Sequence, residues 1–413
     1  MLPMLFTNVV VLDGTGAPLF RGQVLVEADR IQAVAPAGAE VAVQGALRLD
    51  GGGATLMPGL VESHAHLSFI DIVMGTDLGR IPPEEHTLQT MRSARILLEH
   101  GFTSCFSAAS AKPRLDIAVR NAIEMGDIPG PRLLAASPEL TVTSGLGDAR
   151  RQHIYQESFA LVCNGPEEFR RAARTLCREG VDTLKINPSG DTFLPHSRSR
   201  QTVMTEAEVA AVCEVAHAHG LRTAAHARSA EAIKLALRHG VEVIYHANFA
   251  DEEACELLEA AKQHVFVAPT LGATLATLEG APAFGRARDP RDRAMLEQEL
   301  AEGVETARKL QRRGVRVLPG GDHGFAWNPN GSNARDLEVF VKVLGFTPME
   351  AIVAATKLGG ELMRRGHELG QVRAGYLADL LLVDGDPLAD VSILQDDRRL
   401  LAIVKGGVFF KTP

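Results

Sequence analysis

The sequence predicts an α/β protein: a (β/α)8 TIM barrel joined to a small β-sandwich domain formed from both chain ends. The chain has 413 residues. That exceeds the usual single core of about 100 to 200 residues, whereas a barrel of about 250 residues plus a small companion domain uses the length fully. The middle of the chain alternates between strand and helix periodicities. Both ends contain only short β-rich runs separated by turns.

The two chain ends are too short to bury separate hydrophobic cores. Their β-rich runs are 6–12, 22–28, 31–34, 377–383, 400–404 and 407–410. Turn sequences such as Asp13-Gly14-Thr15-Gly16 and Asp384-Gly385-Asp386-Pro387 break these runs. We therefore expect the ends to pair into one domain made of residues 1–57 and 368–413, with the barrel in residues 58–367.

The middle of the chain predicts the eight strands and the outer helices of the barrel. Apolar strand candidates begin near Leu60, Phe102, Arg132, Thr183, Arg222, Val241, Val265 and Val315. Three intervening helices carry start signals: Thr205 opens a capping box, Ser229 is a helix cap, and Thr347 precedes a proline and a glutamate in the first turn. The chemistry of such barrels lies at the C-terminal ends of the strands, so polar residues there are the first functional candidates.

Composition and charge exclude several classes of function. The formal net charge is −8 and no basic run occurs, so nothing favours nucleic-acid binding. The N-terminal stretch lacks the features of a signal peptide or a membrane span, so we expect a cytoplasmic protein without membrane contact. Five widely spaced cysteines without a Cys-x-x-Cys pair fit buried reduced thiols, and we give them no catalytic role. No phosphate loop, dinucleotide signature or nucleophile elbow occurs.

Four histidines near predicted strand ends indicate a metal site. His64 and His66 alternate on an extended strand, so both imidazoles can point to one divalent ion, although two exposed histidines on an ordinary strand would look the same. His226 and His246 end the fifth and sixth apolar strands. One such histidine is usually a core or rim residue, but two on consecutive strands, in register with the first pair, favour metal ligation.

A lysine and an aspartate extend this set to the fourth and eighth strands. Lys185 interrupts an apolar strand, where an unpaired ammonium group is expensive to bury. It either reaches the rim and pairs with a carboxylate, or reacts as a neutral amine with carbon dioxide to give a carbamate that bridges two metal ions. Asp322 follows the eighth strand and either caps the next segment or acts as ligand and proton acceptor.

These residues resemble the motifs of the amidohydrolase superfamily over nearly the whole chain. The matching residues are Pro58-Gly59-Leu60, His64, His66, Lys185, His226, His246, Gly321-Asp322 and the closing segments 375–380 and 383–388. The chain looks most like the imidazolonepropionase-related branch, which includes Xaa-Pro dipeptidases and ochratoxinase. Strand two, the loop after strand three and the residues after His246 depart from the pattern of that branch; these differences leave the metal ligands intact but put its peptidase substrate rules in doubt.

The resemblance implies a binuclear metal centre. Two divalent ions, expected to be zinc, would be held by His64, His66, His226, His246, Asp322 and a carbamate on Lys185. Two ions sharing one water would lower its pKa, so that a bridging hydroxide attacks a carbonyl carbon. Asp322, His246 and Lys185 form the catalytic set, in which Asp322 takes the proton of the water and passes it to the leaving nitrogen.

Residues that follow the ligands indicate the substrate. Arg228 and Asn248 lie two residues after His226 and His246, so strand alternation turns them to the mouth, whereas Tyr245 should face the outer helices. Arg228 either grips a substrate carboxylate or pairs with a nearby acid.

The loops after the first and eighth strands are rich in apolar side chains. They contain Phe69, Ile70, Ile72, Val73 and Met74 in the first loop and His323, Phe325 and Trp327 in the second. Such loops either pack on one another or line a hydrophobic pocket. With Arg228 and Asn248, we expect Phe69, His323 and Trp327 to contact a substrate that has an aromatic or bulky apolar group.

We therefore predict a metal-dependent amidohydrolase. It would cleave an amide C–N bond of a small, carboxylate-bearing and partly aromatic or apolar substrate, such as an N-acyl amino acid, a dipeptide or an aryl amide. A deaminase or a cyclic-amide or urea hydrolase of the same superfamily is the nearer alternative, and a non-catalytic metal-binding barrel is the more distant one. Besides a small-molecule substrate we expect a second copy of the chain as partner, in a homo-oligomer.

Overall fold

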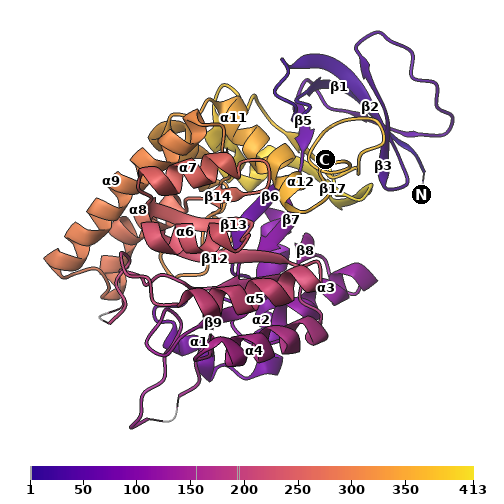
Figure 1. Cartoon of the computed structure of the whole chain (residues 1–413). Helices are drawn as coiled ribbons and strands as arrows, with labels where there is room; N and C mark the ends of the chain where they lie inside the picture. Colours follow the sequence, from indigo (N-terminus) through magenta and orange to yellow (C-terminus); the bar gives the residue numbers. More distant parts are fainter. Residues whose placement is uncertain (1, 155, 193, 195) are drawn as a thin grey trace.

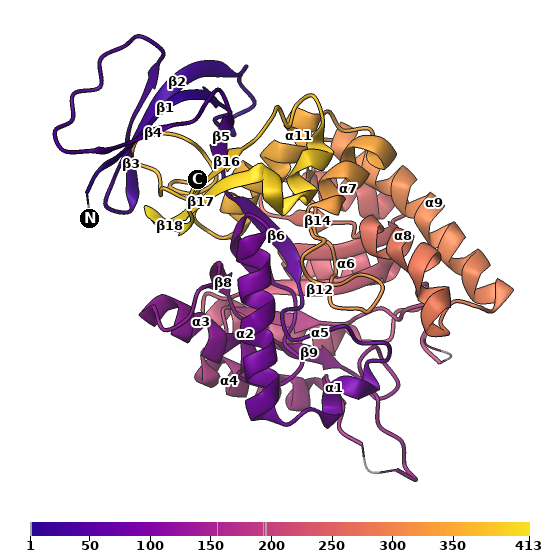
Figure 2. The same ribbon diagram turned by 180° about the vertical axis from the view of Figure 1, so that it is seen from behind.

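The computed structural model describes residues 2–154, 156–192, 194 and 196–413. It shows a barrel of parallel strands surrounded by helices, and a separate β-sheet unit that contains both chain ends (Figure 1). Seen from behind, strands from the beginning and from the end of the chain lie together in this unit (Figure 2). The described helices include none that is long and apolar enough to cross a membrane.

Eight strand positions form the barrel in the predicted order. The strands are β6 (Leu60–Ala65), β7 (Phe102–Ser107), β8 (Arg132–Leu134) with β9 (Ala136–Thr141), β11 (Thr183–Ile186), β12 (Arg222–Ser229), β13 (Val243–Phe249), β14 (Phe266–Ala268) and β15 (Arg316–Val317). All their pairings are parallel, as alternating strands and helices require. The third position is divided at Ala135, so the ladders form two sheets, β6-β7-β8 and β10-β9-β11-β12-β13-β14-β15, with β10 (Leu161–Val162) at one edge.

Single contacts close the barrel between β6 and β15, which share no ladder among the described residues. Ser63 Oγ donates to the carbonyl oxygen of Pro319 at 2.6 Å, and the backbone N–H of Asp322 donates to the carbonyl oxygen of His64 at 3.2 Å. Inside the barrel, side chains of the strands form a core that includes Val61, Phe106, Ala224, Val243, Tyr245, Phe266 and Leu318.

Helices cover the outside of the barrel (Figures 1 and 2). The longer ones are α2 (Pro83–Glu99), α3 (Leu115–Met125), α4 (Pro166–Glu179), α5 (Glu206–Ala218), α6 (Ala230–Arg238), α7 (Glu252–Ala260), α8 (Leu271–Gly280) and α9 (Pro290–Arg312). Shorter helical segments are α1 (Thr76–Arg80), η1 (Ala281–Phe284), α10 (Arg335–Val339), η2 (Phe340–Leu344), α11 (Pro348–Val353), η3 (Ala354–Leu358), α12 (Gly359–Leu362), η4 (Val391–Gln395) and η5 (Asp397–Arg399).

The predicted helix starts are confirmed. Thr205 and Thr347 form capping boxes at the starts of α5 and α11, and the Ser229 hydroxyl accepts from the backbone of Ala232 at the start of α6. These caps satisfy backbone N–H groups that have no partner within the helix. They fix where each outer helix begins, and so how the preceding strand end is presented at the barrel mouth.

Strands from both chain ends form one eight-stranded sheet. They are β1 (Met4–Val11), β2 (Phe20–Glu27), β3 (Arg30–Pro36), β4 (Leu47–Asp50), β5 (Thr55–Pro58), β16 (Leu380–Val383), β17 (Leu400–Lys405) and β18 (Val408–Lys411). The order is β18-β17-β16-β5-β1-β2-β3, with β4 beside β1, and β5 pairs antiparallel with β16. The predicted β-sandwich domain of both ends is thereby confirmed, whereas its exact limits, residues 1–57 and 368–413, stay a prediction.

Candidate metal centre

Six candidate ligands lie together at the C-terminal mouth of the barrel. They are His64 in β6, His66 directly after it, Lys185 in β11, His226 in β12, His246 in β13 and Asp322 in the loop after β15. The histidines and the lysine are buried, and the aspartate is partly exposed. The fold therefore assembles in one place all six residues that the strand-end pattern singles out.

The donor atoms of these side chains converge on a small volume. Asp322 Oδ1 lies 3.2 Å from His66 Nε2 and 3.6 Å from His64 Nε2. His64, His246 and Asp322 each place one donor atom within 4.8 Å of the others. The ring centroids of His226 and His246 are 4.4 Å apart. Nitrogen and carboxylate oxygen donors are the set that zinc and similar divalent ions take.

Hydrogen bonds to the backbone fix which nitrogen of two imidazoles is free. His66 Nδ1 lies 3.1 Å from the carbonyl oxygen of Ala109, and His226 Nε2 lies 3.0 Å from that of Gly190. A carbonyl oxygen only accepts, so these two nitrogens carry the hydrogen. In the neutral rings, His66 Nε2 and His226 Nδ1 therefore keep the free lone pair. This is how metal-binding histidines are usually held.

Burial keeps three of the imidazoles neutral, those of His64, His226 and His246. It lowers the pKa of His226 to about 3 and lowers the pKa values of His64 and His246 well below their usual range. Burial raises the pKa of Asp322, but the nearby histidines, His64 first, outweigh it and keep that pKa below its usual value. Neutral imidazoles and an ionised carboxylate are the forms that bind metal, so these residues fit a divalent ion.

Lys185 lies almost fully buried between a carboxylate and an aromatic ring. Its Nζ is 4.0 Å from Glu139 Oε1 and 4.7 Å from the ring centroid of Tyr245. Burial lowers the pKa of Lys185, and the nearby carboxylates of Glu139 and Asp322 offset only part of that effect. A lowered pKa favours the neutral amine that carbamate formation requires, so the surroundings fit this modification.

The prediction that Tyr245 faces the outer helices is wrong. Its side chain is fully buried in the barrel, its ring centroid lies 3.8 Å from that of His64, and its hydroxyl donates to the carbonyl oxygen of Ser63 at 3.1 Å. The prediction assumes that neighbouring strand residues point to opposite faces, so that Tyr245 points outward when His246 points inward. However, His246 and Ala247 have positive φ angles of 75° and 52°. This change of backbone direction breaks the alternation, so Tyr245 and His246 both point inward.

Glu139 in β9 is a cavity residue that the sequence patterns did not single out. Its side chain lines the cavity, it pairs in register with Lys185 of β11, and Oε2 is buried without a hydrogen-bond partner among the described residues. Burial raises the pKa of this carboxyl group. The signal in the sequence was weak, because β9 reads Ala-Ser-Pro-Glu-Leu-Thr and a charged residue stands out less in this mixed strand than Lys185 does in its apolar one.

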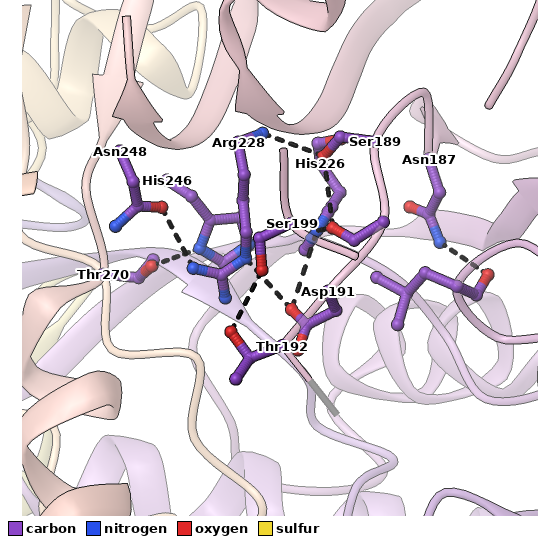
Figure 3. A network of polar contacts seen from close by, with 12 residues as sticks. Asn187, Ser189, Asp191, Thr192, Ser199, His226, Arg228, His246, Asn248 and Thr270 are labelled. Atoms are coloured by element: carbon purple, nitrogen blue, oxygen red, sulfur yellow. Dashed lines mark hydrogen bonds and ion pairs between the residues drawn. The ribbon is translucent and has the colours of Figure 1, made fainter. Parts of the chain in front are cut away.

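Arg228 and Asn248 face each other beside the ligands (Figure 3). Arg228 Nε donates to Asp191 Oδ2 at 3.0 Å, and Nη1 donates to Asn248 Oδ1 at 3.0 Å and to Glu299 Oε2 at 3.4 Å. Of the two alternatives for Arg228, the pairing with acids is the one observed. Arg228 lines the cavity, whereas Asn248 lies behind it and is absent from the described lining.

A cavity of about 340 Å³ lies over the ligands, a volume within the range of about 300 to 1,000 Å³ that is usual for small-molecule sites. Much of its wall is apolar and comprises Phe69, Ile72, Val73, Met74, Phe159, Phe325 and Trp327. The Phe69 ring stacks on His66 in its own loop with centroids 4.3 Å apart, and it makes an edge contact with the Phe325 ring of the other loop at 6.4 Å. The two loops therefore both pack on one another and line the cavity.

His323 is placed differently from this apolar group. It is buried, its Nδ1 lies 3.3 Å from Ser332 Oγ, and it is not part of the described cavity lining. It therefore lies behind Asp322 rather than in front of it, away from the space that a substrate would fill.

Comparison with known proteins agrees with this geometry. The Amidohydrolase family pattern matches residues 55–409. Ochratoxinase of Aspergillus niger is 26% identical over 430 aligned residues, which cover 98% of this chain and 86% of the relative. Imidazolonepropionase of Stenotrophomonas maltophilia is 24% identical over 409 residues, covering 94% and 92% of the two chains. A solved structure of a prolidase complexed with N-methylphosphonate-L-proline superposes with a TM-score of 0.89 at 26% identity and covers 100% of each chain. Because the family pattern spans most of the sequence, the chain belongs to the amidohydrolase family.

Proposed function

We propose that the chain hydrolyses an amide C–N bond of a small substrate at a binuclear metal centre. The ligands of this centre would be His64, His66, His226, His246, Asp322 and carbamylated Lys185. Members of the amidohydrolase family are hydrolases that generally use such a centre. One observation carries the proposal: Asp322 Oδ1 lies 3.2 Å from His66 Nε2, the nitrogen that keeps a free lone pair in the neutral ring. Two facing lone pairs repel each other, and a cation between them removes the repulsion.

The residues at the barrel mouth have different roles in the proposed hydrolysis. Divalent ions, which we expect to be zinc, would when bound to these ligands supply Lewis-acid polarisation of the scissile carbonyl and would lower the pKa of the attacking water. Asp322 takes the proton that this water loses and passes it to the leaving nitrogen. Phe69 stacks on His66 and keeps solvent from that side of the ligands. The Ala109 and Gly190 carbonyl groups hold the orientation of two of the ligating imidazoles.

We propose a substrate with an aromatic or bulky apolar group and a carboxylate, as in an N-acyl amino acid, a dipeptide or an aryl amide. The apolar group would fit the wall formed by Phe69, Phe159, Phe325 and Trp327. Support for a carboxylate comes from the prolidase that this chain resembles, since its bound compound contains L-proline, an amino acid.

A substrate screen tests this function. The metal-loaded protein is incubated with N-acyl amino acids, dipeptides, aryl amides, ureas and lactams, and the products are identified by mass spectrometry. Release of an acid and an amine from an open-chain amide is the expected result. Free ammonia would identify a deaminase, and a ring-opened acid a cyclic-amide hydrolase. Absence of turnover of every class by a metal-replete protein would contradict the proposal.

The role of Asp322 is tested by Asp322→Asn, which keeps a coordinating oxygen but removes the base. Metal content should survive while kcat falls about 100-fold or more, the usual scale for losing general-base catalysis. Asp182→Asn is a matched control, because Asp182 pairs with Arg120 before β11, at the other end of the barrel. A near-normal kcat in metal-replete Asp322→Asn would mean that another group accepts the proton of the attacking water.

A further inference from the structure

Several hydrogen bonds attach residues 189–191, which follow β11, to the end of β12 (Figure 3). We call this set of contacts the fastening. The β11–β12 ladder ends at Ile186 and Ala225. Beyond it, the Ser189 hydroxyl donates to the carbonyl oxygen of His226 at 3.2 Å and accepts from the backbone N–H of Arg228 at 2.9 Å. The Ser189 backbone N–H also donates to the His226 carbonyl oxygen at 3.4 Å, so the Ser189 hydroxyl reinforces the strand pairing beyond the end of the ladder.

This segment presents its next carbonyl group to a metal ligand. Gly190 O accepts from His226 Nε2 at 3.0 Å, and so leaves His226 Nδ1 with the free lone pair. The position admits only glycine, since an added Cβ would lie 2.0 Å from the carbonyl oxygen of Ser197. The orientation of His226 therefore depends on where residues 189–191 are held.

Arg228 holds the other side of this segment. Its Nε–H is taken by Asp191 Oδ2, and its Nη1 hydrogens by Asn248 Oδ1 and Glu299 Oε2. The guanidinium group thereby links the segment after β11 to β13 and to α9. The charge of this buried cation is balanced by the two carboxylates of Asp191 and Glu299, and both carboxylates repel an anion that approaches from the cavity.

We propose that Arg228, Asp191 and Ser189 are positioning residues for the metal ligand His226, and that Arg228 does not grip the substrate carboxylate. The inference rests on the proposed function, because it takes His226 as a ligand. Its observable consequence is that weakening this fastening lowers metal affinity and lowers turnover of charged and neutral substrates alike.

Two variants test the fastening without leaving an unpaired buried charge. Arg228→Lys keeps a cation between the acids but loses the fork of N–H donors, and Ser189→Ala removes the hydroxyl bridge. Zinc affinity, measured by competition with a chelator, should fall by about 10- to 100-fold, the usual effect of altering a group that orients a ligand. Asp191→Asn keeps one acceptor oxygen for Arg228 and should lose less affinity than Asp191→Ala.

The matched control is Arg200→Lys. Arg200 lies in the same segment and also pairs with α9, through Glu302, at 2.5 Å, but among the described residues it forms no hydrogen bond or ion pair with His226 or Arg228. Its replacement should leave zinc affinity unchanged. Circular dichroism and thermal unfolding of every variant establish that it is folded.

A pair of substrates separates positioning from substrate binding. N-benzoyl-L-phenylalanine and its C-terminal carboxamide share the scissile bond but differ in the carboxylate. If Arg228 positions His226, Arg228→Lys lowers kcat for both substrates and leaves the ratio of their kcat/KM values unchanged. A rise of KM for the acid alone, with zinc affinity unchanged in all fastening variants, would overturn the inference while leaving the proposed hydrolase intact. A wild-type protein that neither binds zinc nor cleaves any amide would overturn the proposed function and, with it, this inference.

Discussion

Glu62 should hold the barrel closed at the metal centre. Its Oε1 accepts from the backbone N–H of His64 at 2.9 Å and of Gly321 at 3.2 Å, and its Oε2 accepts from Asn333 Nδ2 at 2.8 Å. His64 belongs to β6, and Gly321 precedes Asp322 after β15. The carboxylate thus bridges the two sides of the barrel that no ladder joins in the described part of the chain.

The cost of losing this bridge follows from its three donors. In Glu62→Ala they lose their acceptor, and each unsatisfied buried donor costs about 1–3 kcal/mol, so we expect a loss of roughly 3–6 kcal/mol after some relaxation. This is a large part of a typical stability of about 5–15 kcal/mol. Glu62→Gln retains one oxygen that can accept from the two backbone N–H groups. Its NH2 group, however, then faces the NH2 group of Asn333, so two donors meet without an acceptor. This variant should cost about 1–3 kcal/mol.

The double variant Glu62→Gln, Asn333→Asp supplies the missing acceptor. It also leaves the net charge unchanged and preserves the oxygen that accepts from the backbone of Gly331 at 2.9 Å. Urea unfolding of the four proteins, with metal removed, gives the free energies, and the double variant should recover most of the loss in Glu62→Gln. The reasoning is refuted if Glu62→Ala unfolds at the wild-type midpoint, or if the double variant is no more stable than Glu62→Gln.

Two further predictions concern Lys185 and the C-terminal strands. Lys185→Ala should reduce bound metal from about two ions per chain and abolish turnover, with partial rescue by added short-chain acids; full metal content and activity by elemental analysis and assay would make Lys185 an ordinary buried residue. Deletion from Gly370 onward removes β16, the partner of β5, and should make the protein insoluble, whereas a soluble truncation with a cooperative unfolding transition would contradict this.

The barrel and its ligand positions could be predicted from the sequence because they depend on local patterns. Strand candidates near Leu60, Phe102 and Thr183 begin where β6, β7 and β11 begin. Buried parallel strands are apolar runs, so a polar residue at the end of such a run stands out. The caps at Thr205 and Thr347 depend on side chains within four residues of each other, and both were found where expected.

The remaining features depend on contacts between distant segments. Strand alternation placed Tyr245 wrongly because the positive φ angles of His246 and Ala247 leave no mark in the sequence. Asp191 and Glu299 meet at Arg228 from segments more than a hundred residues apart, and neither belongs to a motif. Such pairings follow from the three-dimensional approach of loops, which hydrophobic periodicity does not encode.

The position of the ligands makes metal binding a part of barrel stability. His64 lies in the sheet β6-β7-β8 and His66 directly follows its strand β6, whereas Lys185, His226 and His246 belong to the sheet that ends at β15. An ion held by both groups joins the two sheets and binds only the folded state, so it stabilises that state by about 2.7 kcal/mol when the free ion is 100-fold above its Kd.

Removing metal with a chelator should therefore lower the urea midpoint of the wild-type protein, and re-adding zinc should restore it. In Lys185→Ala, and in a variant that lacks His64, metal removal should lower the urea midpoint by less. Each variant removes one of the ligands through which a sheet holds the ions. An equal midpoint with and without bound metal would mean that the ions do not connect the two sheets, and that single contacts such as the Glu62 bridge close the barrel alone.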